Sequence, residues 1–577
     1  FLYNYYFNSP KNLLRRHFQY QGIIKYTDHH LSHTAFSYLT SPYKKAAILT
    51  VDGVGEWETV TISQGVNDKI TKKYSLDFPN SLGMLYSTVT AFLGFKPNEG
   101  EYKVMGLAPF GNPDKYYNIL RKVFKRKSDK FTINQKYFTW EYSDRVMFDL
   151  EFCMLLGLAP RLKEEPITQD HKDLAAALQK VYEYEFEKLL ILAKKITDAP
   201  NICLGGGCAY NGVANKLAQF HFNSVYIPFA PSDAGSAIGA CLLNYKGKRK
   251  DNSSPFLGSE YTDEYVGTEL LKYTNDVRFE YIAGENLLKK TALLLTQENI
   301  IAWFQGRMEF GARALGNRSI LASPKYASMR DKLNKVIKKR EGFRPFAPSV
   351  TMETASKWFD VRQSVPYMNV VTQNRSKKFK AATHIDNSCR VQTVNRNFNF
   401  LYYRLLKEVG NLTGEEVLLN TSFNLKDQTI TRTPEQAVER FLDSDIDTVK
   451  KFIYDTLLNK KHTYLSENYK GKLNEYCHLK GYNEPIYKIV KETGLNHLKK
   501  FTVDTWFSAN IRSQVAMDSA LTHFYNQPIY KNLITTTDSS VTLLLVSLDE
   551  NIVKSASREQ LISAISELIY DYSKTYS

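Results

Sequence analysis

Short apolar runs alternate with amphipathic stretches along much of the chain, and this alternation constrains the fold more than any other feature of the sequence. Residues 46–52 (AAILTVD) predict a buried strand that ends on an acid, and residues 173–196 predict a long amphipathic helix. Residues 201–207 predict a strand that enters a glycine turn, and residues 224–243 a strand, a loop and a helix of small residues. Strands that alternate with helices are typical of an α/β architecture.

The length of 577 residues exceeds what one hydrophobic core usually serves, which predicts more than one domain. Residues 246–255 (KGKRKDNSSP) have the composition of a linker. A second α/β unit, with a strand at 300–304, follows the linker. A Lys- and Tyr-rich tail comes last, and its predicted strands at 501–507 and 541–548 and its final amphipathic helix indicate a small α/β region.

Charge and cysteine usage exclude several classes of protein. The net charge of +16 permits anionic partners such as nucleotides and phosphates, but no arginine-rich tract or RNA-binding aromatic motif accompanies it, so nucleic acid is not expected. No apolar run reaches the roughly 18 residues of a membrane span, so no membrane partner is expected. The six cysteines form no C-x-x-C pair, which argues against a zinc ribbon or a disulfide framework and favours a cytoplasmic protein.

A cluster of histidines occupies residues 28–38 (DHHLSHTAFSY). His29 and His33 are four residues apart and therefore share one face of a helix, whereas His30 points away from that face. Two imidazoles at this spacing can hold one divalent metal. The alternative interpretation is a helix start capped by Asp28, with incidental histidines.

Two aspartates are candidates to complete such a metal site. Asp52 follows a predicted strand, where its carboxylate can reach a metal or phosphate or simply form an Asx turn before Gly53. Asp233 can cap a helix that begins at Ala234, or it can reach a metal held by the histidines. Two imidazoles with one or two carboxylates make a plausible catalytic site for iron or zinc.

Glycine-rich and basic segments are candidates for phosphate binding. Residues 204–212 (LGGGCAYNG) lie between a strand and a helix, where free N–H groups suit an anion, although tight packing is an equally good interpretation. Residues 98–111 (NEGEYKVMGLAPFG), which include Lys103, predict a substrate loop or a solvated turn. Residues 306–319 set Arg307, Arg313 and Arg318 among glycines, and Lys332, Lys338 and Arg340 follow, a pattern that suits phosphate groups better than a plain helix.

Short polar side chains between apolar strands indicate an orienting site further along the chain. They are His384, Arg390, Gln392, Thr421, Ser422 and Asn424. No Ser-His-Asp or Cys-His nucleophile can be argued from the spacing.

Taken in order, the segments DHHLSH, VDGVGEW, NEGEYKVMGLAPFG, LGGGCAYNG, PSDAGSAIGA, FGARALGNRSIL, FRPFAPSV, RVQTV and NTSFN resemble the NodU/CmcH O-carbamoyltransferase family over residues 25–445. The resemblance implies an actin/Hsp70/sugar-kinase-like (ASKHA) carbamoyl transfer domain at 1–255 and a YrdC-like domain at 256–448 that makes carbamoyl adenylate from carbamoyl phosphate and ATP. The α/β region at 449–577 lies outside the resemblance and has no assigned role.

The resemblance also implies the site residues. The metal ligands are expected to be His29, His33, Asp52 and Asp233, with iron as the expected metal and zinc or manganese as alternatives, while magnesium accompanies ATP. Catalytic roles are expected for His29, His33, Asp52, Arg313 and Arg318. Binding of ATP and carbamoyl phosphate is expected of Gly205, Gly206, Gly207, Asn211, Lys103, Arg307, Arg313, Arg318, Lys332, Arg344, His384, Arg390, Thr421, Ser422 and Asn424.

The chain also departs from the family pattern. Family members carry a further N-terminal segment with the first strands of the fold, so this chain is expected to expose a sheet edge, or to obtain those strands from a second copy or a separate chain. Residues 387–389 and 426–431 differ locally from the family motifs. The acceptor is expected to be a small hydroxyl compound. Two other functions stay open: a threonylcarbamoyl-type enzyme acting on tRNA, and a truncated, inactive nucleotide-binding protein that docks a partner.

Overall fold

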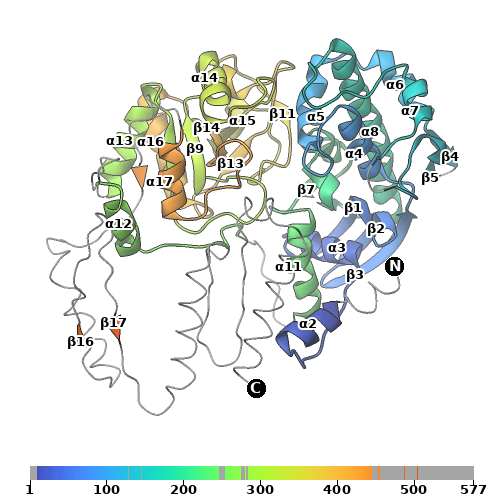
Figure 1. Ribbon diagram of the computed structural model, residues 1–577, viewed down its shortest axis with the longest axis horizontal. Helices are drawn as coiled ribbons and strands as arrows, with labels where there is room; N and C mark the ends of the chain where they lie inside the picture. Colours follow the sequence, from blue (N-terminus) through green and yellow to red (C-terminus); the bar gives the residue numbers. More distant parts are fainter. Residues whose placement is uncertain are drawn as a thin grey trace, which may run out of the picture. The chain divides into compact units, whose positions relative to one another are not determined.

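The computed structural model describes residues 10–444, except 128, 144–145, 246–253, 275–279, 281 and 283, together with the short strands at 453–454, 486–487 and 503–504 (Figure 1). The chain divides into two compact units, residues 1–459 and residues 460–577. In the second unit, the described residues form one antiparallel pair, β16 (Ile486–Tyr487) with β17 (Val503–Asp504). Most of the predicted linker, the predicted strand at 541–548 and the predicted final helix lie outside the described residues.

A five-stranded sheet with the order β3-β2-β1-β6-β7 forms the first half of the larger unit. The strand β1 (Lys45–Gly55) pairs antiparallel with β2 (Glu58–Val66), which pairs antiparallel with β3 (Lys69–Asp77). On its other side β1 pairs parallel with β6 (Asn201–Gly205), which pairs parallel with β7 (Ser224–Tyr226). The strands predicted at 46–52 and 201–207 and the strand that opens residues 224–243 are therefore confirmed.

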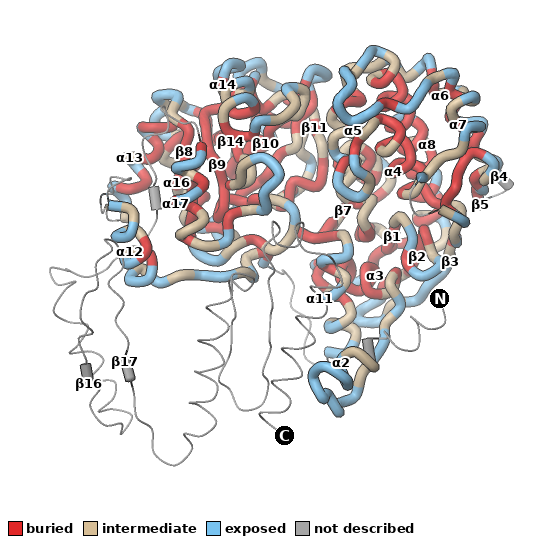
Figure 2. Tube along the Cα trace, in the orientation of Figure 1, coloured by how far each residue is buried: buried red, intermediate tan, exposed pale blue. Residues whose placement is uncertain are grey.

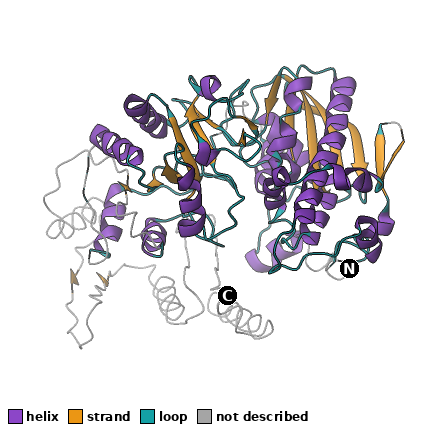
Figure 3. Cartoon of the chain, turned by 90° about the horizontal axis from the view of Figure 1, so that it is seen from above, coloured by secondary structure: helices purple, strands orange, loops and turns teal. Residues whose placement is uncertain are grey.

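Helices cover both faces of this sheet (Figure 3). Because side chains alternate along a strand, Ala47, Leu49 and Val51 of β1 join the core beneath α4 (Leu82–Phe92) and α8 (Gln169–Thr197). The intervening residues Ala46 and Ile48 pack with Tyr38 of α3 (His29–Leu39) on the opposite face. This two-sided burial explains why residues 46–51 read as one continuous apolar run.

The helix α11 (Asp233–Asn244) packs against α3. It begins at Asp233 rather than at Ala234, and its N-cap residue is Ser232. Asp28 is the N-cap residue of α3, but its side chain makes no capping hydrogen bond. Neither aspartate therefore acts as a side-chain cap, and Asp233 stays available for other contacts.

Smaller elements complete this half. They are α2 (Pro10–Phe18), α5 (Glu101–Leu107), η1 (Ala108–Phe110), α6 (Asp114–Arg121), β4 (Phe124–Lys127), β5 (Lys130–Ile133), η2 (Gln135–Tyr137), α7 (Leu150–Leu156), η3 (Gly207–Tyr210), α9 (Gly212–Asn215) and α10 (Ala218–His221).

A six-stranded mixed sheet with the order β13-β10-β14-β9-β8-β15 forms the second half. Its strands are β8 (Ile301–Phe304), β9 (Arg318–Ala322), β10 (Ala347–Thr351), β13 (Gln392–Val394), β14 (Val417–Ser422) and β15 (Ile453–Tyr454). The described helices around it are α12 (Asp263–Leu271), α13 (Gly284–Thr296), α14 (Ala327–Lys332), α15 (Ala355–Trp358), α16 (Phe400–Thr413) and α17 (Pro434–Leu442), with single turns η4 (Leu333–Ile337) and η5 (Lys380–Ala382) and the pair β11 (Thr372–Gln373) and β12 (Ser388–Cys389).

This second sheet is also buried on both faces (Figure 2). Ile301 and Trp303 of β8 pack with α13 and α16, whereas Ala302 and Phe304 pack on the α14 and α17 side. The α/β class predicted from the alternation is confirmed in both halves. Every helix in the described part of the chain is too short or too polar to traverse a lipid bilayer.

Candidate metal centre and substrate cleft

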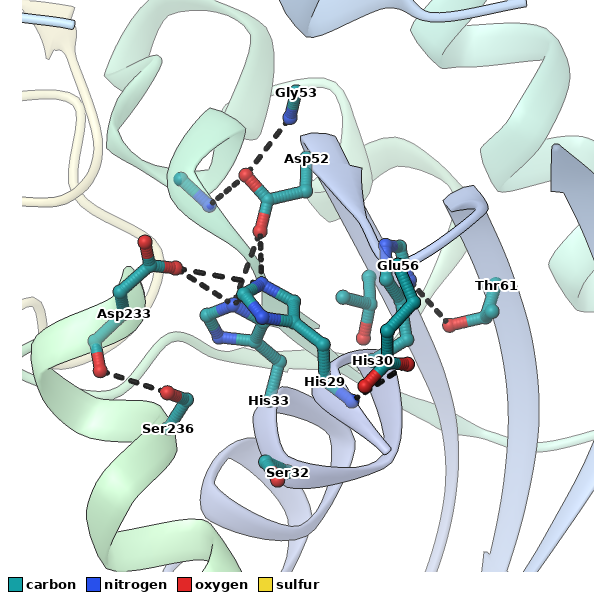
Figure 4. Close-up of polar contacts among 12 residues, drawn as sticks. His29, His30, Ser32, His33, Asp52, Gly53, Glu56, Thr61, Asp233 and Ser236 are labelled. Atoms are coloured by element: carbon teal, nitrogen blue, oxygen red, sulfur yellow. Dashed lines mark hydrogen bonds and ion pairs between the residues drawn. The ribbon is translucent and has the colours of Figure 1, made fainter. Parts of the chain in front are cut away.

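Two histidines of α3, one aspartate in the last part of β1 and one at the start of α11 converge on a single point (Figure 4). The Nε2 atoms of His29 and His33 lie 3.0 Å apart. The Oδ2 atom of Asp52 lies 3.3 Å from His29 Nε2 and 3.0 Å from His33 Nε2. The Oδ1 atom of Asp233 lies 3.4 Å and 3.3 Å from the same two nitrogens. The structure thus brings together the four predicted metal ligands.

The backbone around Asp52 fixes the direction of its carboxylate. Its Oδ1 atom accepts hydrogen bonds from the N–H of Gly53 at 2.8 Å and of Gly207 at 3.3 Å, which leaves Oδ2 facing the histidines. Gly206 makes this turn with a φ of +85°, and a Cβ atom there would lie 2.2 Å from the carbonyl oxygen of Val51. Only glycine fits such a position, so the glycine run aims the carboxylate.

His30 has a separate place in the structure. Its side chain is buried, and its Nδ1 atom contacts the hydroxyl of Thr61 at 3.1 Å. Burial lowers the pKa of His30 to about 4, so this imidazole is neutral near pH 7. The prediction from helical spacing, that His30 points away from the face shared by His29 and His33, is therefore confirmed.

The four converging groups neutralise one another. Hydrogen bonds to Asp233 and Asp52 raise the pKa of His29 to about 10. Burial works against a charged His33, but its hydrogen bonds to the same aspartates outweigh burial and raise its pKa. Burial would raise the pKa of Asp52, yet the histidines hold it well below its usual range, and they lower the pKa of Asp233 directly. With neutral imidazoles the set carries two negative charges, which one divalent cation balances.

The spacing of the donor atoms also fits a cation. Four donors at about 2.1 Å from a common centre lie about 3.4 Å apart in a tetrahedron and about 3.0 Å apart at neighbouring octahedral positions. The nitrogen–nitrogen and nitrogen–oxygen separations here run from 3.0 to 3.4 Å. Two imidazole nitrogens and two carboxylate oxygens suit iron, zinc or manganese. The Asp233 side chain is 77% exposed, so one side of the site is open to further ligands.

Asp52, Gly207 and Asp233 line a cavity of about 2470 Å³ in the larger unit. Four cations, Arg313, Lys338, Arg340 and Arg390, line the same cavity and form what we call its basic wall. The volume exceeds the roughly 300–1,000 Å³ of a pocket for one small ligand. Other predicted binding residues also line it, namely Lys103, Asn211, Arg344, His384, Thr421, Ser422 and Asn424.

The four cations have no carboxylate partner among the described residues. Lys338 is 4% exposed, and its Nζ donates to the side-chain oxygen of Asn424 at 2.6 Å and to the backbone carbonyl of Asn424 at 3.0 Å, both neutral acceptors. Burial, with repulsion from Arg313 and Arg340, holds the pKa of Arg390 well below its usual range. Buried cations that lack acids are costly, so this wall is suited to an anionic ligand.

Residues from the first half of the unit reach this basic wall. The guanidinium of Arg313 lies over the ring of Tyr210, 5.4 Å from its centroid. Arg344 donates to the hydroxyl of Tyr102 at 3.1 Å and pairs with Glu341 at 2.6 Å. Sequence reasoning missed both tyrosines, although each lies inside a motif that was singled out, LGGGCAYNG or NEGEYKVMG.

Several predicted binding residues do not line the cavity. Arg318 is buried, stacks on Phe304 at 3.6 Å, and donates to backbone carbonyls of Ser259, Gly306 and Asn317. These contacts place the Arg318 guanidinium away from the cavity lining, and its catalytic role stays a prediction. The other predicted binding residues that do not line the cavity are Arg307, Lys332, Gly205 and Gly206. The Arg307 guanidinium donates to the backbone carbonyls of residues 257 and 258.

Lys338 and Arg340, which line the cavity, belong to the same basic cluster as Lys332. Lys332 ends α14, whereas the next residues widen into the π-helical turn η4, and this change of helical period rotates the later side chains to a different face. A sequence pattern that assumes a single helical period could not show that Lys338 and Arg340 line the cavity and that Lys332 does not.

Comparison with known proteins identifies relatives of the whole larger unit. Residues 5–242 match the family model described as Carbamoyltransferase N-terminus, and residues 292–460 match Carbamoyltransferase C-terminus. The uncharacterized protein sll1178 of Synechocystis is 38% identical over 459 residues, which cover 74% of each chain. Nodulation protein NolO of Bradyrhizobium diazoefficiens is 32% identical over 434 residues, 73% of this chain and 77% of the relative.

An Amycolatopsis lactamdurans protein named 3'-hydroxymethylcephem-O-carbamoyltransferase is 35% identical over 331 residues, 56% of this chain and 58% of the relative. Among solved structures, full-length HypF in its phosphate- and nucleotide-bound form matches 29% of this chain and 20% of its own length at 18% identity. Its TM-score of 0.21 is too low to relate the folds.

Proposed function

Because the chain belongs to the carbamoyltransferase family, we propose that this enzyme is an ATP-dependent O-carbamoyltransferase. It makes carbamoyl adenylate from carbamoyl phosphate and ATP and transfers the carbamoyl group to a hydroxyl of a small acceptor. One observation carries this proposal: four cations that have no acidic partner among the described residues border the same cavity as a four-donor metal-type cluster.

We assign the two steps to two domains. Residues 1–255 are the ASKHA-type transfer domain, residues 256–448 are the YrdC-like domain that forms the adenylate, and residues 449–577 have no assigned step. The five-stranded sheet with the metal-type donors and the six-stranded sheet with the basic wall support this division.

The first step is a condensation at the basic wall. Water hydrolyses carbamoyl phosphate to carbamate and inorganic phosphate. A carbamate oxygen then bonds to the α-phosphorus of ATP. The bond between the α-phosphorus and the bridging oxygen breaks, and pyrophosphate leaves. Arg313, Lys338, Arg340 and Arg390 spread the negative charge that develops on the phosphates.

The second step is acyl transfer beside the four metal-type donors. The acceptor hydroxyl oxygen bonds to the carbamoyl carbon, the bond from that carbon to the adenylate oxygen breaks, and AMP leaves while the hydroxyl proton passes to a base. His29, His33, Asp52 and Asp233 would hold a divalent cation, with iron expected and zinc or manganese as alternatives. When bound, such a cation supplies a Lewis acid for a phosphate or carbonyl oxygen, and magnesium accompanies ATP.

We place the enzyme in the cytosol, because its described cysteines are all free thiols: Cys153, Cys203, Cys208, Cys241 and Cys389. Its partners in this proposal are ATP, carbamoyl phosphate and a small hydroxyl compound. A homodimer, or a separate chain that supplies further strands, stays a prediction.

Pyrophosphate release tests the proposed function. The full chain is incubated with ATP alone and with ATP and carbamoyl phosphate, and we expect pyrophosphate only with both. Radiolabelled carbamoyl phosphate with 3′-hydroxymethylcephem as a trial acceptor then reports transfer. ATP binding without pyrophosphate in either mixture would contradict the proposal and support an inactive nucleotide-binding protein. A rise in ATP consumption on addition of tRNA would instead favour the threonylcarbamoyl-type function.

A further inference from the structure

An irregular loop, residues 305–317, joins the neighbouring strands β8 and β9. Connections of this length without helix or strand are uncommon in compact domains and are usually functional. Ala312, Arg313 and Ala314 at its centre line the cavity. The loop therefore determines where the guanidinium of Arg313 stands.

One buried carboxylate accepts hydrogen bonds from backbone N–H groups at the end of this loop. Glu309 is 3% exposed, and its Oε1 atom accepts hydrogen bonds from the N–H of Leu315 at 2.7 Å, Asn317 at 2.8 Å and Arg318 at 3.1 Å. Hydrogen bonds to an ionised acceptor are roughly twice as strong as neutral ones. Glu309 thus fixes the backbone immediately after Arg313.

Side-chain amides hold the carbonyl groups of the same stretch. Asn420 donates to the carbonyl of Ala314 at 3.2 Å, and Gln392 donates to the carbonyl of Leu315 at 2.9 Å. Gly316 has a φ of +106°, and a Cβ atom there would lie 2.3 Å from the ring of Tyr402. The loop is therefore held by side chains, in place of the ladder that would hold a strand.

Arg313 itself gains little from its own contacts. Its described neighbours include the ring of Tyr210, and its buried Nε atom has no hydrogen-bond partner among the described residues. A guanidinium that must meet an anion in one orientation binds more tightly when its backbone is already fixed, because less conformational entropy is lost on binding.

We propose that Glu309 is a positioning residue, which holds the loop so that Arg313 faces the anion in the cavity. This inference rests on the proposed function, since it takes the anion to be the triphosphate of ATP. Glu309 does not touch the substrate. It acts through the backbone that carries Arg313.

Direct ATP binding to the full chain tests the inference. In Glu309→Ala, we expect the Kd for ATP to rise at least about tenfold, because the N–H groups of residues 315, 317 and 318 lose their acceptor. In Glu309→Gln, the amide oxygen can keep these bonds without the charge, so the Kd should rise only about two- to fivefold.

Glu415→Gln is the matched control. Glu415 is another buried glutamate of the same half, paired with Lys325 and Lys378 at 2.7 Å, and it does not line the cavity. Glu415→Gln should lower the unfolding midpoint and leave the Kd for ATP within about twofold. Equal losses of ATP affinity in Glu309→Gln and Glu415→Gln would overturn the inference, because general destabilisation would then explain both.

A double-mutant cycle separates positioning from structure. If Glu309 acts through Arg313, then Glu309→Ala added to Arg313→Ala should weaken ATP binding no further than Arg313→Ala alone, within about twofold. Additive losses would overturn the inference. Wild type that binds ATP but releases no pyrophosphate would contradict the proposed function, while the binding cycle would still decide the role of Glu309.

Discussion

The metal centre and the basic wall, two parts of the cavity lining, manage charge in opposite ways. At the metal centre, each of the two histidine Nε2 atoms lies within 3.4 Å of a carboxylate oxygen of both Asp52 and Asp233, so charges of both signs offset each other. At the basic wall, the contacts of Lys338 and Arg313 with the described part of the chain are to neutral acceptors and an aromatic ring. Without a ligand the metal centre keeps its charges paired, whereas at the basic wall a bound anion would supply the missing counter-charge. The difference predicts separate roles that can be tested separately.

Kinetic dissection gives the largest expected effect. Arg313→Ala should lower pyrophosphate release on the order of a hundredfold or more, because the transition-state charge loses a donor. His33→Ala should leave pyrophosphate release within a few-fold and block carbamoyl transfer. The two rates are measured on the same preparations with labelled ATP and labelled carbamoyl phosphate. If both variants lose the same step to the same extent, the metal centre and the basic wall do not have separate roles.

Metal content tests the other end of the comparison. His33→Ala removes one of four donors and should lower the bound metal per chain to a small fraction, measured by elemental analysis after dialysis. His30→Gln is the matched control, because His30 lies in the same helix and contacts Thr61 instead of the donor set. His30→Gln should keep its metal. Equal metal loss in both variants would show that helix α3 has been disrupted and that the four-donor site is not the determinant.

Predictions from the sequence were more accurate for the metal centre than for the basic wall, and the reason is physical. Local rules placed His29 and His33 on one helix face, and the family resemblance implied that they form one ligand set with Asp52 and Asp233, which the structure brings together. The choice between Arg313 and Arg318 depends on the tertiary path of one loop. Both follow glycines or small residues in the sequence, but Arg318 begins β9 and points inward, onto Phe304.

The fold shows the same division. Buried strands such as β1 and β6 appear in the sequence as apolar runs, and they were predicted. The edge strand β3 was missed, because its residues KITKKYSLD are mostly exposed and polar and carry no apolar run. Its place in the sheet comes from pairing with β2, which no local pattern encodes.

Stabilisation by an anion is the next expected effect. Pyrophosphate at about 100 times its Kd should raise the unfolding free energy of the wild type by about 2.7 kcal/mol, through binding to the folded state alone. Arg390→Ala, which removes one cation from the basic wall, should lose most of this gain at the same pyrophosphate concentration. Thermal unfolding with and without pyrophosphate measures both. Arg375→Ala, which breaks an exposed pair with Asp360, is the control and should keep the full gain. An unchanged gain in Arg390→Ala would mean that this wall does not bind the anion.

The pH dependence of stability is the smallest expected effect, and it isolates Lys338. Burial, with repulsion from Arg340 and Arg440, lowers the pKa of Lys338 well below 10.5 in the folded protein. Between that lowered pKa and the unfolded value of about 10.4, the unfolded chain binds more protons than the folded protein, so the unfolding free energy rises with pH. Lys338→Met removes this contribution, and its curve should be flatter than that of the wild type over this window. Pyrophosphate, which favours the charged ammonium, should flatten the wild-type curve in the same way. Parallel curves of unfolding free energy against pH for wild type and Lys338→Met would show that groups within the protein already stabilise the charged ammonium of Lys338. The contrast between the metal centre and the basic wall would then not hold for Lys338.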